Sequence, residues 1–330
     1  MKTSMYQQAK KMTYCLAALT VMGLVNLSCE KEEGEVPQIA FTPPTAAEYN
    51  SLKNDALAVH TEKVTFNAED GIFFTSNDGA TLDISPNCLL KNGAPATGEV
   101  ELTFIDLYDK KDMLATNKPT MGLKPDGKKA ALVSGGEFFI EVRQDGDLLQ
   151  MGCNYQLIVP GDNTGGADPE MSLWKGIIDA NGDLTWDEME EQDQEIFVEG
   201  VDYYIFGNEI GWTNVDRFYN DPREKTTIKV KAPTGFNSEN SAVYLSYDGE
   251  PNTLAQLDTY DAATGTFSEH YGQIPIGLEV HIIFATADGD NWRYAIQGQT
   301  ISEDEVYTFT LEETQVDTME NLLAVIQALP

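Results

Sequence analysis

The stretch GEVELTFIDLY, residues 98–108, alternates polar and apolar side chains almost without interruption. Successive side chains of a β-strand point to opposite faces, so this pattern predicts a strand with one face in a core. Similar runs recur between Gly, Asp and Asn turns: ATLDIS (80–85), GEFFIEVRQDG (136–146), YQLIVPG (155–161), TTIKVKAP (226–233), SAVYLSYDG (241–249), LEVHIIFATADG (278–289) and VYTFTLEE (306–313). Strands of this length and spacing are typical of antiparallel sandwiches. We therefore predict an all-β fold with two β-sandwich domains in tandem.

Helical spacing is clear only at the end of the chain, where Met319, Leu322, Leu323 and Ile326 share one face of residues 318–329. This pattern predicts a short C-terminal helix that packs on the last sandwich. Residues 29–62 contain several Glu and Pro with little periodicity, and we interpret them as a tether or stalk with a short helix near 46–58. The predicted sandwiches then span 63–205 and 206–330, with the crossing near residues 200–208.

The N-terminal segment has the composition of a secretory signal. Lys2, Lys10 and Lys11 precede the apolar run TYCLAALTVMGLV (13–25), and the small residue Ser28 comes before Cys29. This order predicts a cleaved signal peptide over 1–28. The apolar run is shorter than the roughly 20 residues that span a bilayer, and no later run reaches that length. We expect no transmembrane helix.

The residues around Cys29 carry a resemblance. NLSC (26–29) is similar to the relaxed lipobox of Bacteroidetes-type lipoproteins, although Asn26 stands where Leu is typical. The next four residues resemble the tag that exports such proteins to the cell surface: Glu30, Lys31, Glu32 and Glu33. The resemblance implies acyl chains on Cys29, which anchor a protein through buried methylenes. It also implies a location on the outer membrane, facing the exterior.

A second resemblance lies in the first predicted sandwich. GATLDISPNCLLKNGAPATGEVELTFIDL (79–107) resembles the ZU5 pattern of a Gly, a strand ending in Ile-x-Pro, and a later Gly before a long strand. Ser134-Gly135-Gly136 then opens the next strand. The resemblance implies an Ig-like sandwich for contacts between proteins. Some relatives cleave themselves at His-Phe-Ser, but here Phe267-Ser268-Glu269-His270 has another order and lies in the other domain.

The sequence offers one clear hairpin and only weak metal ligands. MSLWKGIIDANGDLTWDEMEE (171–191) predicts a hairpin with an Asn-Gly turn. The same turn offers weak calcium ligands at Asp179, Asn181 and Asp183, but Leu184 stands where an EF-hand loop needs Gly. The tip 288–290 offers a similar pair of aspartates. His60, His270 and His281 lack the spacing of zinc ligands. We expect no cofactor, with Ca²⁺ as the one alternative.

Two cysteines follow the lipidated one, Cys88 and Cys153. An exported protein permits a disulfide between them, which would stabilise the fold by ~4 kcal/mol in the chain-entropy model. The alternative is two buried thiols.

GWTNVDRFYNDPRE (211–224) concentrates side chains that interfaces favour: Trp212, Arg217, Phe218, Tyr219 and Arg223. We interpret the two arginines as part of an internal ion-pair network at the domain junction. A ligand pocket is the alternative.

The charge excludes one class of partner. The chain has 21 Lys and Arg against 54 Asp and Glu, a net charge of −33, and such a field repels nucleic acid. No nucleophile elbow or phosphate loop is present, so no catalytic residues are assigned. We predict a lipid-anchored, non-enzymatic protein that binds a protein or a glycan, or serves as a scaffold. The alternatives are a glycoside hydrolase with paired carboxylates and a structural component of the envelope.

Overall fold

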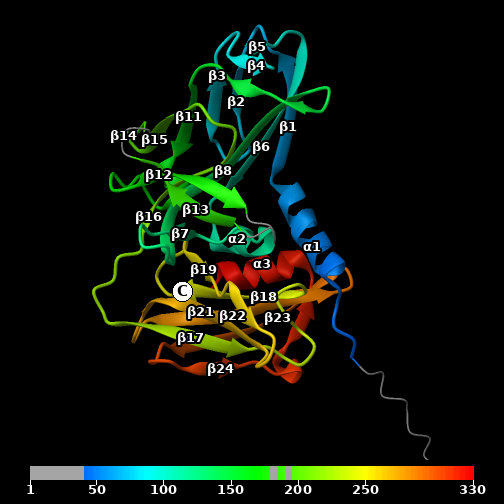
Figure 1. The fold of residues 1–330 in the computed structure, drawn as a ribbon, viewed down its shortest axis with the longest axis vertical. Coiled ribbons are helices and arrows are strands. Elements are labelled where there is room, and N and C mark those ends of the chain that lie inside the picture. Colours follow the sequence, from blue (N-terminus) through cyan, green and yellow to red (C-terminus); the bar gives the residue numbers. More distant parts are fainter. Residues whose placement is uncertain (1–40, 179–183, 191–194) are drawn as a thin grey trace, which may run out of the picture. The chain divides into compact units, whose positions relative to one another are not determined.

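The alternating runs of the sequence become the strands of two stacked β-sandwiches in the computed structural model, which describes residues 41–178, 184–190 and 195–330 (Figure 1). Strands make up 51% and helices 13%, which confirms the all-β prediction. The residues from Thr42 onward form one compact unit.

One sheet of the first sandwich has the strand order β1-β6-β8-β16-β12-β13-β7, with β9 added beside β8. The bounds are β1 Thr61–Asn67, β6 Glu99–Leu107, β7 Met121–Leu123, β8 Lys129–Gln144, β9 Asp147–Leu148, β12 Ser172–Ile178, β13 Leu184–Glu188 and β16 Gly211–Phe218. Because β7 also pairs with β8, five strands close into a ring. Leu132, Trp174 and Trp186 are fully buried in a cluster of this ring. The pairing of β12 with β13 confirms the predicted hairpin.

The facing sheet has the order β14-β15-β11-β3-β2. Its bounds are β2 Ile72–Thr75, β3 Thr81–Ile84, β11 Tyr155–Pro160, β14 Ile196–Glu199 and β15 Asp202–Gly207. Alternation places Leu82 and Leu157 on the inner face, where they share a core with Leu102 and Phe104 of β6.

A small third sheet, β10-β4-β5, completes the first sandwich. Its strands are β4 Leu89–Lys91, β5 Ala94–Pro95 and β10 Gln150–Met151. Cys88, just before β4, and Cys153, just after β10, form a disulfide with their Cα atoms 5.3 Å apart. The bridge closes this end of the sandwich across a sequence separation of 65 residues.

The second sandwich packs the sheet β20-β21-β17-β24 against the sheet β19-β18-β22-β23-β25. The bounds are β17 Lys225–Lys231, β18 Ser241–Tyr247, β19 Leu254–Gln256, β20 Thr259–Asp261, β21 Thr266–Pro275, β22 Glu279–Asp288, β23 Asn291–Thr300, β24 Val306–Thr308 and β25 Gln315–Asp317. Every residue of β18 is buried. This sheet therefore has a second apolar layer on its other face.

Helices form that second layer, between the sandwiches in Figure 1. They are α1 Ala46–Val59, α2 Lys110–Thr116 and α3 Met319–Gln327, with short 3₁₀ turns at Gly161–Thr164 and Leu311–Glu313. Thr45 begins α1 through a capping box with Glu48. Leu322 and Ile326 of α3 are fully buried against the sheet, as the sequence predicted.

The structure differs from two sequence expectations. Strand β15 spans the predicted domain boundary at 205/206, and β16 lies beyond it. Both strands nevertheless pair with strands of the first sandwich. The chain therefore crosses to the second sandwich only after Phe218. Residues 46–59 of the expected stalk form α1, whose Tyr49 is 1% exposed and packs edge-to-face on Trp292. Helix α1 is part of the folded body because its apolar face completes the layer on β18 and β22.

Replacing Tyr49 with Ala tests this role of α1. Removing a buried aromatic ring costs about 3–5 kcal/mol of unfolding free energy, so urea unfolding of Tyr49→Ala is expected at a clearly lower midpoint. The control is Asn54→Ala on the exposed face of the same helix, expected to change stability by less than about 0.5 kcal/mol. Equal midpoints for both variants would show that α1 is a free stalk.

Candidate functional site

Three aromatic rings lie on the outer face of the sheet β14-β15-β11-β3-β2, one of them exposed and two half-buried. Phe197 of β14, 51% exposed, stacks on Tyr204 and Phe206 of β15, with ring centroids 5.9 and 5.8 Å apart and interplanar angles of 2° and 26°. In β15 alternation buries Tyr203 and Ile205 and turns Tyr204 and Phe206 outward. We call Phe197, Tyr204 and Phe206 the aromatic ladder.

The ladder continues across the sheet by register. Tyr204 pairs with Ile158 of β11, and Phe206 pairs with Gln156, so apolar and amide side chains extend the same outer face. Phe73 of β2, at the opposite edge, is 71% exposed, but β11 and β3 lie between it and the ladder, so it is not part of that surface. Cross-strand aromatic pairs stabilise a sheet, and exposed apolar patches are also common at interaction sites, so the ladder is a candidate for one.

A cavity of about 350 Å³ has Phe206 of the ladder in its wall, and its other residues from β11 and β15 include Tyr155 and Ile205, which face the sandwich core. We call it the ladder pocket; its other lining residues are Asn154, Tyr155, Leu173, Lys175, Gly176, Met189, Glu195, Ile205, Gly207, Asn208, Glu209, Ile210, Gly211, Trp212 and Thr213. Lys175 forms an ion pair with Glu209, and Asn154 Nδ2 donates to Glu195 Oε2 at 3.1 Å. The pocket thus combines aromatic walls with amide, carboxylate and ammonium groups.

Trp212, one of the interface candidates, lies in the wall of this pocket. Its ring packs edge-to-face on Trp186 at 6.4 Å and against Phe139 at 5.3 Å, and the residue is 8% exposed. Trp212 therefore belongs to the core of the first sandwich and presents only an edge to the pocket.

The other candidates lie at the sandwich junction. Phe218 packs edge-to-face on Trp174 at 5.1 Å, and Tyr219 on Tyr247 at 5.1 Å, so consecutive residues contact different sandwiches. They line a second cavity of about 360 Å³, the junction pocket, together with Lys124, Ala130, Ala131, Glu170, Arg217, Asn220, Asp221, Lys225, Tyr247 and Gln273. The structure thus combines both interpretations of this stretch, packing and a pocket.

The two arginines form separate local pairs. Arg217 Nε donates to Asp168 Oδ2 at 2.7 Å, and both residues belong to the first sandwich. Arg223 pairs with Asp221 in the following loop and lowers the pKa of Asp221 to about 2. Both arginines at the junction are therefore ion-paired, but in two separate local pairs and not in one network, and the charge of Arg217 also acts on Glu250 of the second sandwich.

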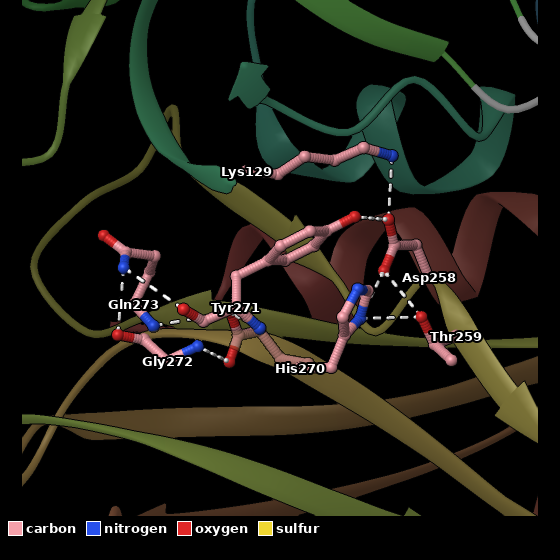
Figure 2. Close-up of polar contacts among 8 residues, drawn as sticks. Lys129, Asp258, Thr259, His270, Tyr271, Gly272 and Gln273 are labelled. Atoms are coloured by element: carbon pink, nitrogen blue, oxygen red, sulfur yellow. Dashed lines mark hydrogen bonds and ion pairs between the residues drawn. The ribbon is translucent and has the colours of Figure 1, made fainter. Parts of the chain in front are cut away.

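A cluster around Asp258 joins the sandwiches instead (Figure 2). Lys129 Nζ at the start of β8 donates to Asp258 Oδ2 at 2.7 Å, and the hydroxyl of Tyr271 on β21 donates to the same oxygen at 3.0 Å. His270 Nδ1 lies 2.8 Å from Thr259 Oγ1 beside it. No sequence signal identifies the cluster, because Lys129 and Asp258 are 129 positions apart.

Glu269 anchors the irregular part of β21 that carries this cluster. Its carboxylate accepts the backbone N–H groups of Tyr271, Gly272 and Gln273, at 3.0, 3.2 and 3.4 Å. Burial raises the pKa of Glu269 to about 7, against the lowering effect of these hydrogen bonds. Lys124 Nζ donates to Gln273 Oε1 at 3.0 Å, a further link from the first sandwich.

A third cavity, of about 330 Å³, contains a carboxyl with a shifted pKa. Burial raises the pKa of Asp106 to about 6, and the nearby charge of Asp78 adds to the rise. Ser76 Oγ donates to Asp106 Oδ2 at 2.7 Å, and Tyr108 donates at 3.3 Å. The other residues of this cavity are His60, Asp109, Lys111, Asp112 and Asn163.

The most deeply buried carboxyls lie at the β8–β16 irregularity. Glu137 and Asp216 are 0% exposed, and burial raises the pKa of each well above its ordinary range. The negative charge of Asp216 raises the pKa of Glu137 further. Gly136 has φ +130°, and a Cβ there would lie 2.7 Å from the Phe138 ring, which explains why Gly stands at this position. No substrate can reach these carboxyls.

The histidines form no metal site in the described part of the chain. Each histidine has an oxygen partner: His60 lies 3.4 Å from Asp112 and His281 lies 2.7 Å from Asp248, besides the contact of His270. Among the described residues no group of three or more His, Cys, Asp or Glu could hold a metal ion. The residues predicted as calcium ligands or as parts of the anchor and its tag lie outside the described residues: Asp179, Asn181, Asp183, Cys29, Glu30, Lys31, Glu32 and Glu33.

The buried carboxyl of Glu137 should make the stability of the fold depend on pH. The folded chain keeps a proton on Glu137 at pH values where the unfolded chain has lost it, so the free energy of unfolding falls as pH rises above about 4.3, the ordinary glutamate pKa. Glu137→Gln should flatten this fall in urea titrations between pH 5 and 9. Glu99→Gln, at an exposed position, should leave the slope unchanged. Identical slopes for the two variants would contradict the buried-acid assignment.

None of the helices in the described part of the chain is long and apolar enough to cross a membrane. No protein-family model matches the chain, and no curated protein matches it. The likeness to ZU5 segments and to surface lipoproteins therefore remains a resemblance of short motifs, and the geometry above is the basis for any assignment of function.

Proposed function

We propose that the protein is a lipid-anchored, non-enzymatic binding protein on the outer face of the outer membrane, and that its ligand is a glycan. One observation carries the choice of ligand: the aromatic ladder adjoins a pocket lined by polar groups. The first sandwich supplies both, so a rigid sheet positions them.

The chemistry of the two surfaces matches that of a sugar chain. A pyranose ring has apolar C–H faces that pack on aromatic side chains, while its hydroxyl groups donate and accept hydrogen bonds. Phe197 and Tyr204 offer apolar surface, and Asn208, Glu195 and Lys175 offer donors and acceptors in the pocket. A pocket of a few hundred Å³ accommodates one or two sugar rings.

Anchoring follows from the sequence alone. A lipid on Cys29 with the acidic tag behind it would hold the sandwiches outside the cell, where polysaccharides are accessible. The net charge of −33 favours a neutral sugar chain over a polyanion as the ligand of the ladder.

Phe197→Ala should weaken binding to the preferred polysaccharide at least tenfold, about 1.4 kcal/mol, because it removes the central ring of the ladder. The measurement is affinity electrophoresis of the full chain in gels that contain xylan, galactan, starch or pectin. Phe73→Ala is the matched control, an exposed Phe on the same sheet but at its opposite edge, and should bind normally.

Equal retardation of both variants would contradict the ladder as the binding surface. Release of reducing ends from the bound polysaccharide would favour the alternative, a glycoside hydrolase. Asp106 is the observation that supports this alternative, because a carboxyl with a pKa of about 6 beside a second carboxylate suits a general acid. Its cavity lies apart from the ladder pocket and shares none of its lining residues.

The anchor is tested separately. Cys29→Ala removes the thiol that would carry the acyl chains, so the protein should move from the membrane fraction to the soluble fraction of fractionated cells. Replacing Lys31, Glu32 and Glu33 by Ala should leave it in the membrane fraction but protect it from protease added to whole cells. Membrane association of Cys29→Ala would exclude the lipid anchor.

A further inference from the structure

The junction pocket has a composition unlike the rest of this acidic chain. It is formed by the β7–β8 turn, the end of β16, the loop to β17, and residues of β18 and β21. Three of its lining residues are basic: Lys124, Arg217 and Lys225. They come from three separate segments, so only the fold brings them together.

Two of these cations have no carboxylate as a direct partner. Lys124 Nζ donates to the amide oxygen of Gln273 at 3.0 Å, and Lys225 Nζ donates to the backbone oxygen of Asp221 at 2.9 Å. Within the described part of the chain, neither ammonium has a carboxylate oxygen within 4.0 Å. With 54 acids available, two lysines that face a cavity with neutral partners are an unusual pairing.

The charges also repel one another. Burial lowers the pKa of Lys225, the charge of Asp221 opposes this, and the positive charges of Lys124 and Arg223 lower it again. Of the two acids in the wall, Asp221 attracts Lys225 more strongly than either neighbouring cation repels it, but its carboxylate is also paired with Arg223, and Glu170 is exposed. An anion in the pocket would relieve this repulsion and accept the unused N–H groups of both lysines.

The walls of the pocket indicate what carries the anion. Phe218 and Tyr219 provide ring surface, and Lys124 Nζ lies 6.0 Å from the centroid of Phe218. A cavity of about 360 Å³ has room for a ring as well as the charged group. An inorganic anion would use only the ammonium groups.

We propose that the junction pocket binds an organic acid of about the size of one sugar ring, with its carboxylate between Lys124 and Lys225. This site is independent of the proposed glycan-binding surface, because the junction pocket and the ladder pocket share no lining residue. Its ligand would contact both sandwiches, since Lys124 belongs to the first and Lys225 begins the second.

Isothermal titration of the full chain with glucuronate, glucose and inorganic phosphate tests the proposal. The two sugars differ only in the group at carbon 6, a carboxylate against a hydroxymethyl. Glucuronate should bind at least tenfold more tightly than glucose and than phosphate, and less tightly as salt rises. Tighter binding of phosphate than of glucuronate would replace the organic acid by an inorganic oxyanion and overturn the proposal.

Two double variants distinguish binding at the junction pocket from a general effect of the chain's net charge. Lys124→Ala with Lys225→Ala should weaken glucuronate binding at least tenfold. Lys128→Ala with Lys231→Ala removes the same charge at exposed positions and should change it less than twofold. If the first variant fails to fold, the exposed Lys225→Gln alone should weaken binding at least threefold. Equal losses in both double variants, or no loss in Lys225→Gln, would overturn the site.

Discussion

The two-sided burial of one sheet determines how this chain is assembled. Strand β18 is buried along its whole length, because the second sandwich core covers one face of its sheet and helices cover the other. Those helices come from three distant places: α1 before the first sandwich, α2 between β6 and β7, and α3 after the second sandwich. The apolar layer thus ties both sandwiches into one unit. Lys110 of α2 adds a direct link, donating to the backbone oxygens of Leu329 and Pro330.

This assembly separates the candidate surfaces. Helices and the Asp258 cluster occupy the junction between the sandwiches, and the junction pocket lies there as well. Residues at the junction therefore hold the sandwiches together and also line a cavity. The outer face of the sheet β14-β15-β11-β3-β2 does not connect the two sandwiches. Its inner residues already fill the core, and the half-exposed ring of Phe197 contacts only the neighbouring rings of the same outer face in the described structure. That contrast is why the ladder, and not the predicted 211–224 stretch, is the stronger candidate for recognition.

Sequence periodicity predicted the elements better than their partners. Alternation identified β11 and β17, and the spacing of Leu322 and Ile326 identified α3, because one buried face leaves a local signal. The domain boundary was wrong because β15 and β16 look like any other half-buried strands, and only pairing shows which sheet they join. The ladder and the Asp258 cluster were missed for the same reason. Phe197 and Tyr204, or Lys129 and Asp258, become neighbours only through the register of the folded sheets.

The central claim is that the first sandwich binds a glycan with its ladder and the adjoining pocket. Hydrogen–deuterium exchange of the full chain, with and without a saturating polysaccharide from the gel panel, tests it most directly because it reports every segment at once. The account predicts slower exchange in β14, in β15 and in residues 208–213 of the pocket, with no change in the second sandwich. Protection confined to the second sandwich, or to the cavity around Asp106, would contradict it.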